Sequence, residues 1–559
     1  MKRKLSPYFL LVLLVLVMAS CSKKVNVPVP ADASMVIHIS GSSLKSKLSW
    51  DEFKKGELYK VASENIDDSL GKQILDNPAV SGIDIESDAF FFARSRGRGG
   101  YIAFTCSLKD DKAFAAMVKK VSHEDAIKTG DLYVIKDNRT VMTWNSNRFV
   151  FIADSPDLGA DAFGSSQSTS SRSLDEDSLI KFANEVYTIK GSDAIGSNEK
   201  FASMMKESGD MHFYVNGGRF AKNSFGKYLS LTKASVLLDG NFTTATLNFD
   251  NGKITIDSKS YVNKDLAAIY KKYAGRKLDD NMLKKIPSNN INAVIAASYP
   301  PEGLKELIVL TGVDGIVNSF LEEMGYSMDE FIKANKGDIL FSVSDFKIKK
   351  KEMKYMMGDK EQVYYSDKPD AKILFATSVK DKAAFQKMVN IVSQKINEQG
   401  GMFSAEAAKI PFSLKDDWFV AGNDTAAVEA FGTGSNNQAF ISKISGHPVG
   451  AYIDIQKFIA GSKSSMEKDE TASAIADQSM KFWQDIVFYG GEFKDEASEG
   501  HVEINLVDKT TNSLKQLNTY LGTMAKAADD RKKKDMQQWQ NNTLPPDTVP
   551  TVMPAPKVK

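Results

Sequence analysis

The feature that most constrains this chain is a segment of 22 residues that occurs twice. Residues 101–122 read YIAFTCSLKDDKAFAAMVKKVS, and residues 372–393 read KILFATSVKDKAAFQKMVNIVS. Aligned without a gap, the two copies share 11 of 22 residues, and most other positions keep their apolar or polar character. Any fold that accommodates this chain must therefore contain one local structure twice.

Other landmarks recur in the same order along the chain. Tyr214-Val-Asn216 is matched by Tyr452-Ile-Asp454, and Gly252-Lys-Ile-Thr-Ile256 is matched by Gly500-His-Val-Glu-Ile504. The period is roughly 250 residues, whereas solenoid and propeller repeats have periods of about 20–50 residues. The pattern therefore predicts two homologous halves rather than an array of small repeats.

Each predicted half, residues 31–285 and residues 286–530, alternates short β-type runs with amphipathic helices. In both copies of the repeated segment, Phe, Met, Val and Val recur at i, i+3, i+4 and i+7, which places them on one helix face. Asp110 and Asp381 precede these helices, where a carboxylate accepts hydrogen bonds from free backbone N–H groups. Asp250-Asn-Gly252 is typical of a tight hairpin turn. The predicted fold class is α+β, with a mostly antiparallel sheet in each half and helices packed on one face.

Composition narrows the possible functions. The chain has 559 residues, 42% of them hydrophobic, and its 72 basic residues balance its 71 acidic residues. No overall field favours nucleic acid, so no nucleic-acid partner is expected. Two cysteines and five scattered histidines provide little for a disulfide scaffold or a metal site. We therefore expect no metal and no cofactor, and we expect Cys106 to be a small buried apolar residue.

Catalytic motifs are also missing from the sequence. The nucleophile elbow G-x-S-x-G, the zinc motif H-E-x-x-H, the Walker A loop and a Rossmann G-x-G-x-x-G in a strand–helix context do not occur. Ser42 and Lys45 fit S-x-x-K, but the partner motifs of penicillin-binding enzymes are absent. We expect no catalytic residue, although convergent acids or a Ser/His pair could be brought together by the fold.

The N-terminus has the pattern of a secretory signal. Lys2, Arg3 and Lys4 precede an apolar run from Tyr8 to Met18, which at 11 residues is shorter than the about 20 that span a membrane. The following Ala-Ser-Cys21 resembles the lipobox of bacterial lipoprotein precursors. The resemblance implies that residues 1–20 are a lipoprotein signal peptide and that Cys21 carries the lipid. Acyl chains there would hold the protein at a membrane without a spanning helix.

Two further segments are predicted to lie outside the folded halves. Residues 21–30 form a short tether, and residues 531–559 form a charged, then proline-rich, disordered tail. Acidic residues directly after a lipidated cysteine are linked to inner-membrane retention or to surface export. No acidic residue directly follows Cys21. We therefore expect the cell envelope, at the periplasmic face of the outer membrane, with the cell surface as the alternative.

A basic connection occurs in both halves between two apolar strands. It could bind an anionic partner such as a phosphate-bearing molecule or a glycan. The alternative is a solvated hairpin tip whose charges prevent edge pairing, and this is the commoner role of charged loops. The residues of this possible anion- or partner-binding loop are Arg94, Arg96 and Arg98 in the first half and Lys349, Lys350 and Lys351 in the second.

The lipobox, the opening Pro-x-x-Ala-x-x-Val pattern and the repeated Phe-x-x-Ser-x-Lys-Asp-x-x-x-Phe-x-x-Met-Val core resemble an uncharacterised lipoprotein family of Bacteroides-type bacteria, domain of unknown function 4836. The resemblance brings no activity, cofactor or functional residue. The expected function is that of a membrane-anchored, non-enzymatic binding or scaffold protein of the periplasm. Two alternatives remain: a hydrolase acting on glycan or peptide, and a lipid or lipoprotein carrier with an apolar cavity between sheet and helices.

Overall fold

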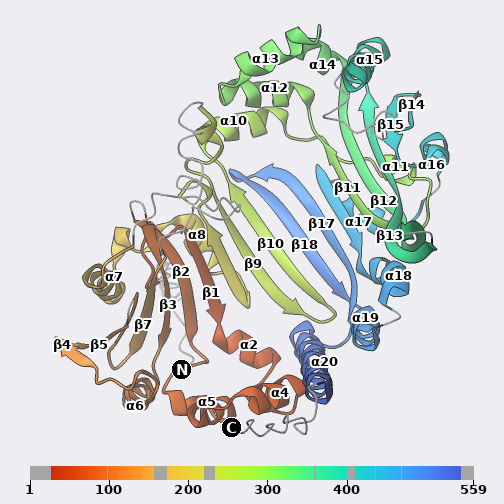
Figure 1. Ribbon diagram of the computed structural model, residues 1–559. Coiled ribbons are helices and arrows are strands. Elements are labelled where there is room, and N and C mark those ends of the chain that lie inside the picture. Colours follow the sequence, from red (N-terminus) through yellow and green to blue (C-terminus); the bar gives the residue numbers. More distant parts are fainter. Residues whose placement is uncertain are drawn as a thin grey trace, which may run out of the picture.

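The computed structural model describes residues 27–96, 99–137, 139–155, 173–219, 233–357, 360–398, 410–434, 436–466 and 469–542 (Figure 1). Its 18 strands form one continuous sheet in which every hydrogen-bonded neighbour is antiparallel. The predicted α+β class with antiparallel pairing is confirmed. The sheet curves as an arch, with helices gathered at both of its ends.

We call the strands on either side of the β10–β18 pair the first wing and the second wing. In sheet order, the first wing contains β4 (Ile127–Thr129), β5 (Leu132–Asp137), β6 (Thr140–Trp144), β7 (Arg148–Asp154), β3 (Gly99–Ser107), β2 (Asp88–Arg96), β1 (Met35–Ser40), β8 (Met211–Val215), β9 (Phe242–Asp250) and β10 (Lys253–Tyr261). The second wing continues with β18 (Ala497–Leu506), β17 (Trp483–Lys494), β16 (Val449–Asp454), β11 (Ile291–Ser298), β12 (Asn335–Met357), β13 (Lys360–Val379), β15 (Trp418–Gly422) and β14 (Phe412–Lys415).

The two wings have the same strand order around their first strands. In the first wing, Val36 of β1 lies opposite Phe92 of β2 and Tyr214 of β8. In the second wing, Val294 of β11 lies opposite Ser342 of β12 and Tyr452 of β16. Further along, Ala103 and Leu374 occupy the matching positions on β3 and β13, the strands that carry the repeated segment.

The wings join through a nine-residue ladder between β10 and β18. The middle pair of this ladder is Asp257 with His501, and their side chains form an ion pair with Oδ1 and Nδ1 2.6 Å apart. The two hairpins that contain β10 and β18 have their turns at Asn251-Gly252 and Asp495-Glu496. Gly252 and Glu496 both have positive φ. The hairpin predicted at Asn251-Gly252 is confirmed. Counted from these turns, Lys253 of β10 corresponds to Ala497 of β18. This correspondence differs by four residues from the sequence match between residues 252–256 and 500–504.

Helices lie on both faces of the sheet, so the prediction of helices on one face is wrong. Ala103 of β3 packs in a core with α7 (Glu176–Thr188) and α8 (Glu199–Met204). Cys106, three residues further, packs with α6 (Asp111–Ser122). Side chains an odd number of positions apart in a strand face opposite ways. The sequence showed amphipathic helices but not which side of the sheet each would cover.

The second wing is built in the same manner. Its larger core joins β11–β13 to α11 (Asp280–Lys284), α16 (Thr425–Ala430) and α17 (Ala439–Ile444), and α15 (Lys382–Glu398) packs over a smaller one. The remaining helices are α2 (Gly41–Lys47), α3 (Trp50–Lys54), α4 (Glu57–Asn65), α5 (Ser69–Asp76), α10 (Lys264–Tyr273), α12 (Pro301–Leu310), α13 (Asp314–Glu323), α14 (Met328–Ala334), α18 (Ile455–Met466), α19 (Glu470–Phe482) and α20 (Ser513–Asn542), with 3-10 turns η1 (Pro78–Ser81), η2 (Gly191–Asp193), η3 (Ile195–Ser197) and η4 (Lys233–Leu237).

Both ends of the described chain differ from expectation. Val27 and Val29 are fully buried in the first-wing core, so the expected tether cannot extend to residue 30. Two apolar side chains entering a core cannot stay solvated. At the other end, α20 continues to Asn542, so the polar stretch after residue 530 is helical. Among the described residues, we find no helix with the length and apolarity needed to cross a membrane.

Candidate functional site

The largest cavity described lies beneath four short helices of the first wing. It has a volume of about 1390 Å³ and is enclosed by α2, α3, α5 and η1, by strands β2 and β3, and by the start of α20. Small-molecule sites usually occupy about 300–1,000 Å³. Most of its lining residues are apolar: Ile39, Leu44, Leu48, Trp50, Phe53, Ile66, Ile74, Leu75, Pro78, Ala79, Ile83, Ile85, Ala89, Phe104, Cys106, Met117 and Leu514.

The helices over this cavity bury few residues completely. Helices α2 and α3 bury none, and α5 buries only Leu70. Apolar side chains of these three helices, including Ile74 of α5, border the cavity, whereas α4 lies against α20. An amphipathic helix normally buries its apolar stripe against a core. Here that stripe forms the wall of an apolar space.

Ten of the 29 residues that line the cavity are polar, and six of these ten are charged. Lys45 pairs with Glu86, with Nζ and Oε1 2.5 Å apart, and both side chains are about half exposed. Inside, Trp50 has a buried indole Nε1 with no hydrogen-bond partner among the described residues. The cavity thus combines an apolar interior with a charged rim, the arrangement that accommodates an apolar ligand with a polar end.

Cys106 is a free thiol on the cavity wall. It is buried, and burial raises the pKa of the thiol despite its contact with Ser87 Oγ at 3.4 Å. The prediction of a small buried apolar residue is confirmed. A thiol with a raised pKa is a poor nucleophile at neutral pH.

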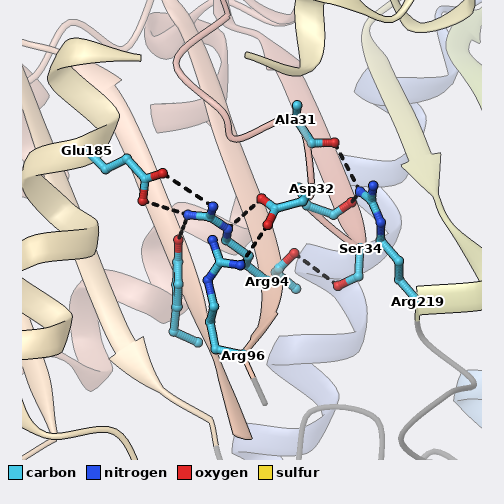
Figure 2. A network of polar contacts seen from close by, with 10 residues as sticks. Ala31, Asp32, Ser34, Arg94, Arg96, Glu185 and Arg219 are labelled. Atoms are coloured by element: carbon cyan, nitrogen blue, oxygen red, sulfur yellow. Dashed lines mark hydrogen bonds and ion pairs between the residues drawn. The ribbon is translucent and has the colours of Figure 1, made fainter. Parts of the chain in front are cut away.

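The predicted arginine patch lies inside the first wing (Figure 2). Arg94 is 5% exposed; its Nε lies 2.6 Å from Asp32 Oδ1, and its Nη1 lies 2.7 Å from Glu185 Oε2. Arg96 donates to the other oxygen of Asp32 at 2.7 Å, and both guanidinium groups lie beside the ring of Phe182.

This network bears on the anion-binding prediction for the first half. Arg94 is poorly placed to bind an external anion, because its buried guanidinium already pairs with two partly exposed carboxylates, Asp32 and Glu185. Arg96 shares the carboxylate of Asp32 and is also engaged within the wing. Arg98 lies outside the described residues.

The second-half counterpart is a long, exposed hairpin. Strands β12 and β13 have 23 and 20 residues, and Lys349, Lys350 and Lys351 lie on the exposed part of β12. Lys349 Nζ pairs with Asp370 Oδ2 of β13 at 2.7 Å. The described cations on the two connections therefore differ: in the first wing Arg94 is buried and Arg96 is partly exposed beside Asp32, and in the second the lysines lie along a solvated ladder.

Two histidines that are distant in sequence meet in the first wing. His38 of β1 lies opposite His212 of β8, and their Nδ1 atoms are 3.0 Å apart in a buried setting. His38 Nε2 is 3.1 Å from Asp88 Oδ1. Burial lowers the pKa of His212, and the nearby His38 adds to that effect. Sequence spacing gave no signal for this pair, because register across two non-consecutive strands creates it.

We find no group of three or more His, Cys, Asp or Glu side chains that could hold a metal ion within the described ranges. Cys21, the predicted lipidation residue, lies outside those ranges.

Comparison with known proteins identifies the family. The family described as "Domain of unknown function (DUF4836)" matches residues 25–437, and the chain belongs to it. No curated protein matches the chain. Two solved structures, crystal forms I and III of TP0453, share 12% and 11% sequence identity with it. They cover 42% and 45% of this chain and 78% and 87% of theirs, with TM-scores of 0.23 and 0.24. Similarity at that level carries no functional argument.

Proposed function

We propose that this protein is a lipid-anchored envelope protein that binds the acyl chain of a lipid or lipoprotein in the first-wing cavity. The observation that carries this proposal is the cavity of about 1390 Å³, in which 17 of 29 lining residues are apolar. At about 25 cal/mol per Å² of apolar surface, a buried methylene group contributes about 0.8 kcal/mol, so an acyl chain gains several kcal/mol on entry.

Two features favour an acyl chain over a compact apolar ligand. The volume exceeds that of ordinary small-molecule sites. The charged rim, with Lys45 beside Glu86 and Lys109 nearby, provides partners for a carboxylate or phosphate end that must stay hydrated. The binding role needs no catalytic group, consistent with a sequence that lacks catalytic motifs.

The cavity predicts a direct ligand test. The chain, purified from envelopes without added lipid, is expected to release fatty acyl species that mass spectrometry detects, and to bind a fluorescent fatty acid. Ile74→Trp should place a larger ring in the cavity, obstruct the path of an acyl chain and weaken that binding at least about tenfold. Lys72→Trp, on the exposed side of the same helix, is the matched control and should bind as the parent does. Equal binding by both variants, or a parent that binds no fatty acid, would contradict the proposal.

We propose anchoring through Cys21 at the periplasmic face of the outer membrane, supported by the N-terminal signal pattern. Val27 and Val29, at the start of the described chain, are buried in the first wing, so only five residues separate Cys21 from the folded body. A connection that short reaches about 20 Å. Cys21→Ala should abolish incorporation of labelled palmitate and move the protein to the soluble fraction. A labelled Cys21→Ala variant would refute the anchor.

We also propose that the wings descend from one duplicated unit, residues 31–285 and 286–530. Support comes from the repeated segment and from the matching neighbours of Val36 and Val294. Superposition of β8-β1-β2-β3-β7 on β16-β11-β12-β13-β15 should align those residues without a register shift. A best superposition that is shifted by one or more residues would contradict common descent.

A further inference from the structure

One position in the shared framework is filled differently in the two wings. At the edge of the first-wing core, Phe242 of β9 and Tyr261 of β10 are paired across the ladder, and their rings stack with centroids 4.9 Å apart. The corresponding pair in the second wing is Asp485 of β17 and Asn505 of β18. Replacing two aromatic rings with two short polar side chains leaves an open space there.

That space is a polar cleft of about 470 Å³ between the sheet and α17. Amide groups of Asn505, Gln438 and Gln484 line it, and the stacked rings of Phe440 and Tyr452 form an apolar part of its wall. It can contain a small polar molecule, about the size of a monosaccharide.

Lysines dominate the charge of the cleft. Lys253 and Lys443 approach opposite oxygens of a single carboxylate, Glu503, at 2.7 and 2.5 Å. Lys509 also lines the cleft, and it has no ion-pair partner among the residues that the structure describes. Partial burial lowers the pKa of Lys509 and prevails over the nearby carboxylate of Asp485, which raises it. Lys443 also lowers this pKa, whereas Glu503 and Lys253 act in opposite directions. An anion placed between Lys509 and Lys443 would be attracted by both ammonium groups.

The two acids that line the cleft already have partners. Asp454 caps α18 by accepting from the backbone N–H of Lys457 at 2.9 Å, and it pairs with the ammonium of Lys457 at 3.2 Å. Asp485 accepts from Asn505 Nδ2 at 2.7 Å, and burial raises the pKa of its carboxyl. Asp454 is thus paired with a lysine and Asp485 with a neutral amide. With Glu503 included, four lysines face three carboxylates around the cleft, so its net charge is positive.

We propose that this cleft binds a small polar molecule bearing a phosphate or carboxylate group, with Lys509 and Lys443 receiving the anion. The amides of Asn505, Gln438 and Gln484 donate to or accept from hydroxyl groups of the ligand body. This site is on the second wing and does not depend on the acyl cavity of the first.

Calorimetric titration of the full chain with glucose 6-phosphate, glucuronate, glucose and inorganic phosphate tests this proposal. Glucose 6-phosphate or glucuronate should bind at least about tenfold more tightly than glucose, since the anion is the anchor, and more tightly than inorganic phosphate, since the amides need a polar body. Binding should weaken as salt rises. Absence of binding by both acidic sugars at millimolar concentration would overturn the proposal, as would equal binding of inorganic phosphate.

Two variants locate the site. Lys509→Gln removes an exposed cation and should weaken binding at least about tenfold, whereas Lys120→Gln on the exposed face of α6 should change nothing. The double change Asp485→Phe with Asn505→Tyr copies the first-wing filling and should abolish binding while circular dichroism stays unchanged. If that double variant fails to fold, Lys509→Gln still decides: unchanged affinity in this variant would refute the site.

Discussion

The two wings share a strand framework but differ in the helices inserted after the first strand of each. In the first wing, β1 leads into α2–α5, of which α2, α3 and α5 line a cavity of about 1390 Å³ with six charged residues among 29 lining it. In the second wing, β11 leads into α12–α14, of which α12 and α14 border α10 around about 740 Å³ with five charged residues among 11. Wings with the same strand order can therefore carry a mostly apolar cavity on one side and a more charged one on the other.

The edges of the two cores also differ: the edge is closed in the first wing and open in the second. The aromatic pair Phe242 and Tyr261 closes the first wing where Asp485 and Asn505 open the second. Strand register is fixed by the buried apolar pattern, which resists change because a one-residue slip exposes the whole core face. The ends of strands and the helical inserts carry no such constraint, and there the wings differ.

The largest expected effect comes from breaking the join between the wings. Thr255→Pro places proline in central strand β10, which pairs with both β9 and β18. The lost ladder hydrogen bond and the ring clash should lower the free energy of unfolding by about 3 kcal/mol or more. Lys128→Pro in the outermost strand β4 is the control and should cost less. Urea unfolding measures both, and equal losses would mean that the join is not a central structural element.

The arginine network of the first wing should contribute more to the free energy of unfolding than the matching position of the second wing. Asp32→Asn leaves the buried Arg94 with one carboxylate, Glu185, and should cost about 2–3 kcal/mol. At the matching position of β12, Ser344 is buried but uncharged, so Ser344→Ala should cost about 1 kcal/mol or less. Thermal unfolding of the two variants compares the wings. A smaller loss for Asp32→Asn than for Ser344→Ala would contradict this difference.

Acid should weaken the second wing through Glu503. Burial would raise the pKa of this carboxyl, but hydrogen bonds from Lys253 and Lys443 prevail and lower it from 4.5 to about 2. A folded pKa below the unfolded value stabilises the protein above about pH 4.5, and this contribution disappears as pH falls towards 2. Solvent access to both lysines limits it to about 1–2 kcal/mol. Glu503→Gln should flatten the stability profile between pH 5 and 2, roughly, in urea titrations. An unchanged profile would refute the assignment.

The smallest effect is expected at the hairpin of the second wing. Lys349 and Asp370 form an exposed ion pair, so Lys349→Gln should change the free energy of unfolding by about 0.5 kcal/mol or less. Raising the salt concentration should remove even that difference. A loss comparable to that of Asp32→Asn would show that exposed and buried cations in the two wings act alike.

Local features were predictable from sequence because neighbouring residues determine them. Asp110 accepts from the backbone N–H groups of Lys112 and Ala113, and Asp381 accepts from that of Ala384, as expected of helix caps. The DUF4836 family and the antiparallel α+β fold are also recognisable from patterns along the chain.

Features that depend on distant pairing were not predictable. From the sequence, Arg94 is expected to be a charged residue of a loop. Only the approach of Glu185 from α7 makes it an internal residue. The His38–His212 pair and the alignment of β10 with β18 arise from registers between strands far apart in sequence. The apolar cavity likewise requires knowing that the apolar side chains of α2, α3 and α5 leave a space above the sheet.

One framework is proposed to carry two unlike sites, an apolar cavity in the first wing and an anion-binding cleft in the second. Titrating parent, Ile74→Trp and Lys509→Gln proteins with a fluorescent fatty acid and with glucose 6-phosphate tests this directly. We expect Ile74→Trp to lose only the fatty acid and Lys509→Gln to lose only the sugar phosphate. Loss of both ligands in either variant, or of neither in both, would contradict the presence of two independent sites.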